Sequence, residues 1–206
     1  MRYTGPRNRL ARREGIDLGL KSVGSKAQSN LLRKLSIIPG QHGHSRMSKP
    51  SDYGIQLREK QKLKRIYGMT EKQMKIFFLA SSKKVGNTAE HLINILEKRL
   101  DNAVFKLGFA PTRAAARQLV AHGHILINDK KTTIPSYIVS QGDEISFRRK
   151  KSIKIPYIAQ ILEKKDFIVS PWMIRQGPVG KVVSDPDLTH FQEDVNLQSV
   201  VEFYSR

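Results

Sequence analysis

Arginine, glutamine and histidine side chains recur at close spacing between residues 97 and 124 of this 206-residue sequence. Arg113 and Arg117 are four residues apart, so a helix would place both on one face, with Gln118 beside them. Guanidinium groups bind phosphate oxygens through paired hydrogen bonds, and amide side chains add further donors. Such a surface reads the shape of a folded RNA rather than the edges of its bases. The segment therefore predicts an RNA-binding surface, with a DNA-binding helix-turn-helix as its structural rival.

Two His-Gly-His runs, at residues 42–44 and 122–124, raise the question of a metal site. A zinc site needs three or four ligands, and neither run has cysteines or an organised set of carboxylates to complete one. Because both runs lie among basic residues, we expect their imidazoles to form hydrogen bonds with a nucleic acid. The sequence therefore predicts no metal and no cofactor.

The sequence carries no recognisable catalytic motif. Residues 176–181 contain two glycines and a lysine, but the glycines are too close together for a phosphate-binding loop and no Ser or Thr follows the lysine. No nucleophile elbow, HExxH motif or dinucleotide fingerprint occurs. The acidic residues are few and mostly adjoin Lys or Arg, unlike the paired carboxylates of acid–base catalysis. We therefore expect a binding protein rather than an enzyme.

Capping residues and apolar periodicity indicate the helices that must position these side chains. Ser51 predicts the start of a helix over residues 51–67. Thr70 and Gln73 have capping-box spacing, which predicts a second helix that ends near Gly86. Farther on, leucines at helical spacing predict one helix from Asn87 to Gly108.

The pattern changes after a short helix that begins at Thr112 and ends at Gly123, with both of its arginines pointing outward. From residue 125 apolar residues alternate with polar ones, which predicts strands around a turn at residues 128–131. Further strands are expected at 134–139 and 145–147. Residues 90–150 therefore form a compact α+β unit. Beyond it, the pattern indicates a short helix near 158–162 and one more strand at 167–169.

The chain carries 37 Lys and Arg residues against 18 Asp and Glu, a formal net charge of +19. Residues 1–50 carry +9, residues 51–92 carry +5, residues 93–155 carry +7 and residues 156–206 carry −2. So basic a chain favours nucleic acid as the first partner and an anionic membrane surface as the second. The absence of cysteine excludes disulfides and thiolate metal sites, and no apolar run reaches 18 residues. The acidic last quarter indicates a protein-facing segment, or simple charge balance.

The first fifty residues are rich in Gly, Ser and Arg and contain one aromatic residue, Tyr3. They cannot bury enough apolar surface to fold alone. We expect a basic arm that becomes ordered on a nucleic acid, with a disordered solubilising tail as the alternative. Residues 1–17 have no apolar stretch behind their positive charge, so a secretory signal is not expected.

Several long motifs carry a family resemblance. Residues 96–145, which begin LEKRLDNAVFKLGFAPTRAAARQL, resemble the small RNA-binding module of the ribosomal protein S4 family, which several RNA-modifying enzymes and a class of synthetases also carry. The resemblance to the bacterial-type small-subunit members extends over nearly the whole chain, through RYTGP (2–6), PGQHG (39–43), YGIQLREKQKLKRIYG (53–68), GNTAEH (86–91) and VEFYSR (201–206).

This resemblance implies a primary rRNA-binding protein that nucleates small-subunit assembly at a multi-helix junction in the 5′ domain. It implies contact with the neighbouring ribosomal protein S5 and other small-subunit proteins, near the mRNA entry channel, and a part in translational accuracy. It places the protein in the ribosome of the bacterial cytoplasm or of an organelle, with no membrane or small-molecule partner. Some members carry a cysteine zinc knot in the N-terminal arm, but this chain has no cysteine, so zinc is not expected.

The resemblance also implies a domain plan within an α+β fold class. Residues 1–45 form a basic N-terminal arm that becomes ordered on rRNA. Residues 46–92 form an all-helical domain, completed by about 186–206. Between them, residues 93–185 form an inserted α+β domain with a small, mostly antiparallel sheet, and the helix–helix–hairpin RNA-binding module occupies about 96–158.

The expected site residues are mainly basic, amide, histidine and tyrosine side chains on the arm, the helices and the module. No catalytic residue is expected. The RNA-binding candidates are Arg2, Tyr3, Arg7, Arg9, Arg12, Arg13, Gln41, His42, Arg46, Lys49, Tyr53, Arg58, Lys62, Lys64, Arg65, Lys83, Lys84, Arg99, Asn102, Arg113, Arg117, Gln118, His122 and His124. The candidates for contact with a neighbouring protein are Glu202, Phe203 and Tyr204.

Two other classes of protein compete with this interpretation. An RNA-modifying enzyme, such as a pseudouridine synthase, could use the same module, but it would need a further catalytic domain. The module leaves only about 90 residues before it and about 55 after it, which is too few. A nucleoid or membrane-surface protein held only by charge would not require the capped helices and the ordered module.

Overall fold

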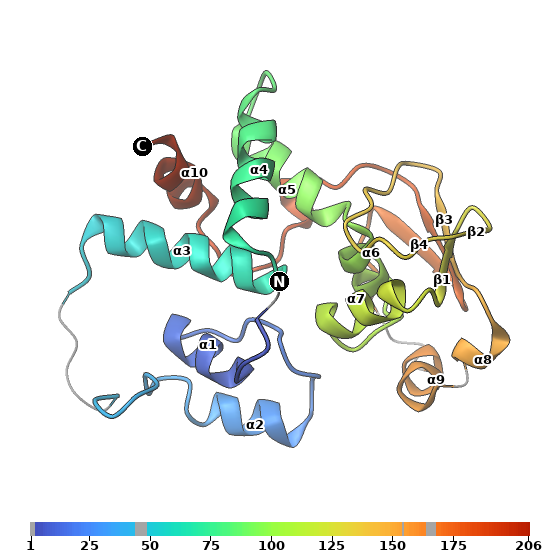
Figure 1. Cartoon of the computed structure of the whole chain (residues 1–206), viewed down its shortest axis with the longest axis horizontal. Helices are drawn as coiled ribbons and strands as arrows, with labels where there is room; N and C mark the ends of the chain where they lie inside the picture. The colour runs from blue at the N-terminus through green and yellow to red at the C-terminus, as the bar shows by residue number, and fades with distance from the viewer. Residues whose placement is uncertain (1–2, 44–48, 154, 164–167) are drawn as a thin grey trace. The chain divides into compact units, whose positions relative to one another are not determined.

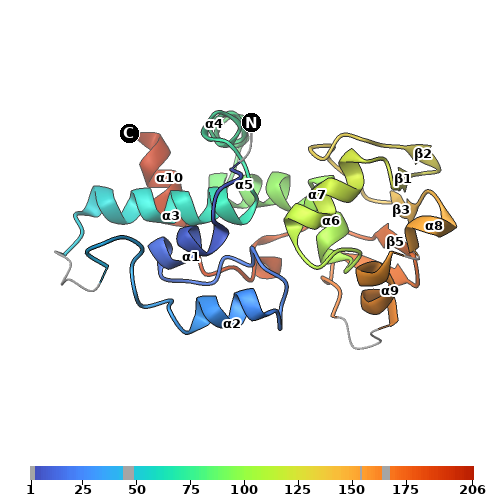
Figure 2. The same cartoon turned by 60° about the horizontal axis from the view of Figure 1, so that its bottom comes forward.

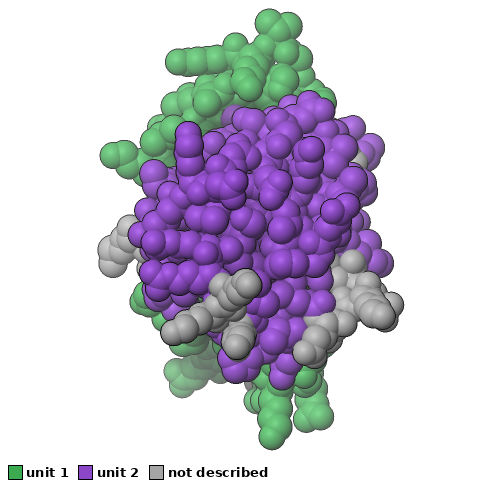
Figure 3. Space-filling model, turned by 90° about the vertical axis from the view of Figure 1, so that its right-hand side faces the viewer, with its two compact units in different colours: residues 1–92, 193–206 green, residues 93–192 purple. Residues whose placement is uncertain are grey.

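The computed structural model describes residues 3–43, 49–153, 155–163 and 168–206 (Figure 1). The chain forms two compact units, residues 1–92 with 193–206 and residues 93–192, which Figure 3 distinguishes by colour. Helices and one antiparallel sheet make up the described residues, which confirms the predicted α+β class. No described helix is both long and apolar enough to cross a bilayer.

The first unit is helical, and its two central helices begin at the predicted caps. The Ser51 hydroxyl accepts a hydrogen bond from Gly54 N at the start of α3, and Thr70 and Gln73 form the capping box of α4. Leu63, Met74 and other apolar side chains are buried among these helices. The helices of this unit are α1 (Arg7–Glu14), α2 (Lys26–Leu32), α3 (Asp52–Ile66), α4 (Glu71–Ser82), the start of α5 (Thr88–Glu97) and α10 (Leu197–Ser205).

The N-terminal segment contains two helices that the sequence does not predict. α1 lies beside α2 and α3 in both views (Figure 1 and Figure 2). It ends where Gly15 takes a left-handed conformation, with φ 72°. Few apolar side chains are buried here, among them Ala11, Leu18 and Leu31. Side-chain bonds to backbone carbonyls supply the remaining order, as where Asn8 donates to Ala27 O at 2.9 Å. Such contacts join residues far apart in sequence, so local composition cannot reveal them.

The last helix completes the first unit. α10 packs on α3 and α4. The Tyr204 ring stacks on Phe78 with centroids 4.9 Å apart, and its hydroxyl donates to Glu71 Oε1 at 2.8 Å. The neighbouring ring of Phe203 has Lys60 Nζ 4.1 Å from its centroid. The C-terminal segment thereby joins helices that precede it by more than a hundred residues.

The second unit packs helices against a five-stranded antiparallel sheet of order β2-β1-β3-β5-β4. Its core gathers Leu100, Val104, Phe109, Ile145 and Trp172, all fully buried, with their apolar neighbours. Its elements after α5 are α6 (Leu100–Lys106), α7 (Arg113–Ala121), β1 (Ile125–Ile127), β2 (Lys130–Lys131), β3 (Glu144–Phe147), α8 (Lys150–Ile153), α9 (Pro156–Glu163), β4 (Met173–Gln176), β5 (Val179–Val182) and the 3₁₀ turn η1 (Leu188–His190).

The single helix predicted from Asn87 to Gly108 is wrong, because the chain breaks between α5 and α6. Arg99 is extended, with ψ 136°, and forms an isolated antiparallel bridge to Ile138. Leu100 N donates to Tyr137 O at 2.8 Å, and Val139 N donates to Lys98 O at 2.9 Å. Pairing with a segment forty residues away thus interrupts a helix whose apolar spacing is continuous.

The strands also differ in part from those predicted. Ile127 pairs with Lys130 across a two-residue turn in which Asn128 and Asp129 both have positive φ, so Lys130 and Lys131 form β2 rather than the turn. Residues 134–139 have only the isolated bridge. No strand is assigned at residues 168 and 169, and Phe167 lies outside the described residues.

The hairpin of β4 and β5 is absent from the prediction because its strands are short and weakly patterned. Gly180 on β5 lies directly against Leu107, since a Cβ there would be 2.5 Å from Leu107 Cδ1. The glycine is therefore required by a close approach that only the tertiary structure creates.

Candidate nucleic-acid interface

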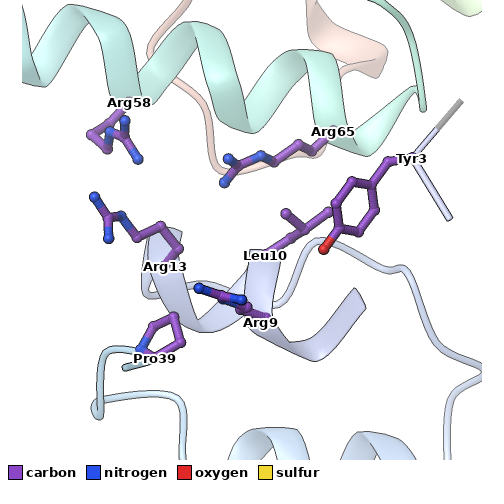
Figure 4. A pocket seen from close by; sticks show the side chains of 7 residues that line it. All are labelled: Tyr3, Arg9, Leu10, Arg13, Pro39, Arg58 and Arg65. Atoms are coloured by element: carbon purple, nitrogen blue, oxygen red, sulfur yellow. The ribbon is translucent and has the colours of Figure 1, made fainter. Parts of the chain in front are cut away.

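A basic pocket of about 400 Å³ opens in the first unit, between α1, α3 and the segments that flank α1 and α2 (Figure 4). Four guanidinium groups face it, two from each helix, and a phenol and two apolar side chains complete its walls. No acidic residue is among those that line it. The lining residues, which we call the arginine pocket, are Tyr3, Arg9, Leu10, Arg13, Pro39, Arg58 and Arg65.

Helical spacing accounts for the convergence of the four arginines. Arg9 and Arg13 are four residues apart on α1, which places both on one face. Arg58 and Arg65 are seven residues apart on α3, or two turns, and also share a face. Because α1 packs against α3, these two faces meet, and Figure 4 shows the side chains directed toward the same space. All four residues are predicted RNA-binding residues that the fold brings together.

A buried carboxylate holds the two α3 arginines in place. The Glu14 side chain is fully buried and its Oε1 accepts hydrogen bonds from Arg65 and from Arg58, the latter at 3.3 Å. Burial raises the pKa of Glu14, and the charges of Arg65 and Arg58 act in the opposite direction. Burial also lowers the pKa of Arg65, although a guanidinium group remains protonated near neutral pH. One carboxylate thus orients two cations without neutralising the pocket.

Two other arginines of α1 stabilise the segments around the pocket. Arg12 donates from Nε to Ile37 O at 2.9 Å and from Nη2 to Ile38 O at 3.3 Å, which holds the chain just before Pro39. Arg7 donates to Leu20 O at 3.3 Å. Their guanidinium groups are therefore partly committed to backbone carbonyls, and among the arginines of α1 only Arg9 and Arg13 are exposed.

The second unit contains a buried polar network at the junction of α6 and α7. Arg99 is completely buried, and it donates to Asp101 from Nε at 3.1 Å and from Nη2 at 2.7 Å. The Asp101 carboxylate also accepts from Asn102 N at 3.0 Å and from Arg117 Nη1 at 3.2 Å. Four donors therefore satisfy this carboxylate, as a buried charge requires.

The network continues through an amide to a third arginine. Asn102 donates to Glu97 Oε2 at 2.9 Å and accepts from Arg113 Nε at 2.8 Å. Arg113 is 9% exposed and its guanidinium carbon lies 4.7 Å from the centroid of the Phe105 ring. The expectation that Arg113 points outward is therefore wrong.

Direct RNA contact by Arg99, Asn102 and Arg113 does not fit their burial. Their exposed fractions are 0%, 1% and 9%, and each is engaged with polar groups of the same unit. They support the surface from beneath, where Asp101 fixes the half-exposed Arg117. Residue type and spacing suggested contact because the sequence does not reveal which face of α6 and α7 packs inward.

An exposed, mainly basic surface follows α7 into the hairpin of β1 and β2. We call it the hairpin strip and define it as Arg117, Gln118, His122, Lys131 and Arg148. Gln118 and His122 are exposed, and the His122 and His124 rings are 6.2 Å apart. Lys131 covers Gly123, because a Cβ at that glycine would lie 2.6 Å from Lys131 Cε. Arg148 N donates to His124 O at 2.8 Å, which places the Arg148 backbone next to that of His124. The hairpin strip thus combines predicted residues with two basic ones that the prediction omits.

Lys131 and Arg148 were not predicted as site residues, because only the strand register brings them next to the histidines. The two-residue Asn128-Asp129 turn places Lys131 opposite Leu126, and this turn sequence could have predicted the position of Lys131. His124 itself is half-buried, and its Nδ1 lies 3.0 Å from Ser152 Oγ.

The remaining predicted site residues are scattered over the first unit or lie outside the residues that the structure describes. Lys62 pairs with Glu59 at 2.6 Å, and Lys64 pairs with Glu71 at 3.0 Å. Arg2 and Arg46 lie outside the described residues, as does His44. The exposed residues Gln41, His42, Lys49, Tyr53, Lys83 and Lys84 lie on the turn at residues 41–43, at the start of α3 and at the end of α4.

The residues predicted to contact a neighbouring protein lie on α10. Phe203 and Tyr204 are half-buried in the packing of the first unit, whereas Glu202 is exposed and accepts from Gln56 Nε2 at 2.9 Å. Contact of these residues with another protein stays a prediction. Within the described part of the chain, no group of three or more His, Asp or Glu side chains is placed to hold a metal ion.

Comparison with known proteins identifies relatives over the whole length. The model of the ribosomal protein S4/S9 N-terminal domain matches residues 2–97, and that of the S4 domain matches residues 98–145. The small ribosomal subunit protein uS4 of Thermus thermophilus is 46% identical over 208 residues, covering 100% of this chain and 99% of the relative. Proteins of the same name from Herpetosiphon aurantiacus and Brevibacillus brevis are 48% and 46% identical, with the same coverage.

Proposed function

This chain belongs to the uS4 family of small-subunit ribosomal proteins, and from that membership we propose that it binds small-subunit rRNA directly as a structural constituent of the ribosome. The observation that carries the proposal is the arginine pocket, where four guanidinium groups converge and one buried carboxylate faces two of them. An excess of fixed positive charge of this kind is suited to phosphate groups, which supply most of the affinity between proteins and nucleic acids.

We further propose that the protein is a primary rRNA binder that nucleates small-subunit assembly at a multi-helix junction of the 5′ domain. Each of the two units has a cationic surface of its own, the arginine pocket in the first and the hairpin strip in the second. Two separate binding surfaces on one chain can hold two RNA helices, and linking them raises the affinity for RNA that presents both. This arrangement supports a role in fixing the geometry of a junction.

The proposals about a neighbouring protein, mRNA and translational accuracy rest on family membership rather than on a contact seen in the structure. We propose that α10 presents Glu202 to the neighbouring ribosomal protein S5, that mRNA passes nearby, and that this contact contributes to translational accuracy. We place the protein in the bacterial cytoplasm, within the ribosome. An enzymatic role is not proposed, because the relatives that match this chain over its whole length are named small ribosomal subunit protein uS4.

Binding measured over a range of salt concentrations tests the central proposal. The full-length protein is titrated against a 5′-domain transcript of small-subunit rRNA and against a random duplex RNA of equal length. We expect much tighter binding to the transcript, with log affinity falling by roughly 0.7 to 0.9 per phosphate neutralised for each decade of salt. Equal affinity for both RNAs at every salt concentration would contradict specific rRNA binding.

A further inference from the structure

We propose that the arginine pocket binds a single nucleoside phosphate, with its phosphate between the guanidinium groups and its base against Tyr3 and Leu10. In the ribosome this ligand would be an unpaired nucleotide of the rRNA, so the inference deepens the proposed function and rests on it. The same chemistry could also accept a free nucleotide, and the experiment below separates the two sources.

The charges in the pocket provide a phosphate-binding end. Arg9 and Arg13 are exposed, and within the described residues neither has a hydrogen-bonded or ion-paired carboxylate. Arg58 is 35% exposed at its side chain, so it is accessible to a ligand while Glu14 fixes its position. Guanidinium groups bind phosphate through paired, charge-assisted hydrogen bonds. Three of them around one cavity can therefore donate to one phosphate from several sides.

One end of the pocket is suited to a base rather than to a second phosphate. Leu10 has an apolar side chain that gains nothing from a phosphate oxygen, and Tyr3, drawn next to it in Figure 4, adds an aromatic ring that is 52% exposed. Unpaired RNA bases are commonly bound by stacking on aromatic side chains, which is tolerant of base identity. The phosphate end and the base end together match one nucleotide.

The shape of the pocket favours an unpaired nucleotide over the backbone of a duplex. The volume of about 400 Å³ lies within the range of roughly 300 to 1,000 Å³ that is typical of small-ligand sites. A base inside a duplex is stacked and paired, so its ring faces are covered and cannot stack on a protein side chain. A concave site with an aromatic wall would therefore remain half empty on a duplex.

The pocket is also held open before any ligand arrives. The bonds from Arg12 to Ile37 O and Ile38 O fix the segment that leads into Pro39. On the opposite side, Tyr3 lies over Gly5, where a Cβ would be 2.6 Å from its hydroxyl oxygen. Because these contacts order the walls in the free protein, less conformational entropy is lost on binding.

Two RNA hairpins test the inference with the full-length protein. They share one stem, and one of them has a single bulged adenosine. At 0.15 M salt, we expect the protein to bind the bulged hairpin about tenfold more tightly than the paired one. Tyr3→Ala should remove that preference while keeping the affinity for the paired hairpin, because stacking is lost and the charges remain. The matched control is Tyr137→Ala, which alters a tyrosine 39% exposed in the second unit and should keep the preference.

Titration with adenosine monophosphate distinguishes the two sources of the ligand. Binding of the free nucleotide that is lost in Tyr3→Ala, without a preference for the bulged hairpin, would support a pocket for free nucleotides. A bulge preference lost in Tyr3→Ala supports an rRNA nucleotide. If the protein shows neither, or if Tyr3→Ala retains the bulge preference, the pocket does not bind a nucleoside phosphate. That failure would leave the rRNA-transcript titration unaffected, so the proposed function stands or falls separately.

Discussion

Arginine serves opposite purposes in the two units of this protein. In the arginine pocket of the first unit, Arg9 and Arg13 are exposed, and Glu14 holds Arg58 and Arg65 from behind. In the second unit, Arg99 is completely buried beneath the surface, and its guanidinium group donates two hydrogen bonds to the buried Asp101 carboxylate. Both sets look alike in sequence, since each consists of arginines within a helix or next to one. The two sets differ in how deeply the guanidinium groups are buried and in which carboxylate contacts them.

The difference shows that the burial of the guanidinium group, together with the carboxylate beside it, decides what an arginine does. Asp101 accepts two bonds from the completely buried Arg99 and one from Arg117, and this group organises the turn into α6. Where one Glu14 carboxylate faces two arginines and two more stand beside them, positive charge remains for a ligand. The first arrangement stabilises the fold, and the second is the one that we propose for RNA binding.

The largest effect that would break the comparison is expected from Arg99→Ala. Removing one partner of a buried ion pair leaves the other charge unpaired, which costs about 3–5 kcal/mol in the free energy of unfolding. Urea denaturation followed by circular dichroism measures the loss. Arg33→Ala, at an exposed arginine of the first unit, should change stability by no more than about 0.5 kcal/mol. Equal, small effects of both variants would show that burial does not separate the two kinds of arginine.

The second prediction concerns affinity rather than stability. Arg9→Gln combined with Arg13→Gln removes two exposed cations from the arginine pocket, so affinity for the rRNA transcript should fall roughly tenfold at 0.15 M salt. The slope of log affinity against log salt should become shallower by about 1.4 to 1.8, while the free energy of unfolding stays constant.

A charge-matched control sharpens this result. Arg33→Gln combined with Lys34→Gln removes the same charge from exposed positions just after α2, outside the pocket. If this control reduced affinity and slope as much as the pocket variant, binding would depend on net charge alone.

The smallest effect is expected at Glu71, a half-exposed carboxylate. Burial raises the pKa of Glu71, but hydrogen bonds from Lys60, Lys64 and Tyr204 outweigh it and lower the pKa to about 2. Since the carboxylate is ionised more easily in the folded state, its stabilising contribution is complete above about pH 4.5 and is lost as the pH falls toward 2. Solvent screening at a side chain 46% exposed limits the contribution to about 1 kcal/mol or less.

Glu71→Gln therefore separates from the wild type in a pH-dependent way. The difference in unfolding free energy between the two proteins should be largest near pH 6 and should shrink between pH 4.5 and 2, as measured by urea denaturation at each pH. Glu90→Gln, at an exposed carboxylate of α5, should show no such trend. A constant difference across the range would mean that the interactions of Glu71 do not depend on its charge.

Local signals were sufficient for part of the fold and of the site. The caps at Ser51 and Thr70 are short-range hydrogen-bonding preferences and occur where they are predicted, and the turn predicted at residues 128–131 occurs at its first two residues, Asn128 and Asp129. The break at Arg99 could not be predicted in this way, because a strand-like bridge to Ile138 overrides continuous helical periodicity. Helices α1 and α2 were missed for a similar reason, since much of their order comes from side chains bonded to distant carbonyls.

By itself the sequence determined the α+β class, the excess of positive charge, the starts of α3, α4, α5 and α7 and the family, because composition, capping and long motifs are local properties. The tertiary structure decided which basic residues face solvent. It gathered Arg9, Arg13, Arg58 and Arg65 into one pocket and withdrew Arg99 and Arg113 from the surface. The physical reason is that burial and the pairing of charges depend on groups brought together from distant parts of the chain, and spacing along one helix does not contain that information.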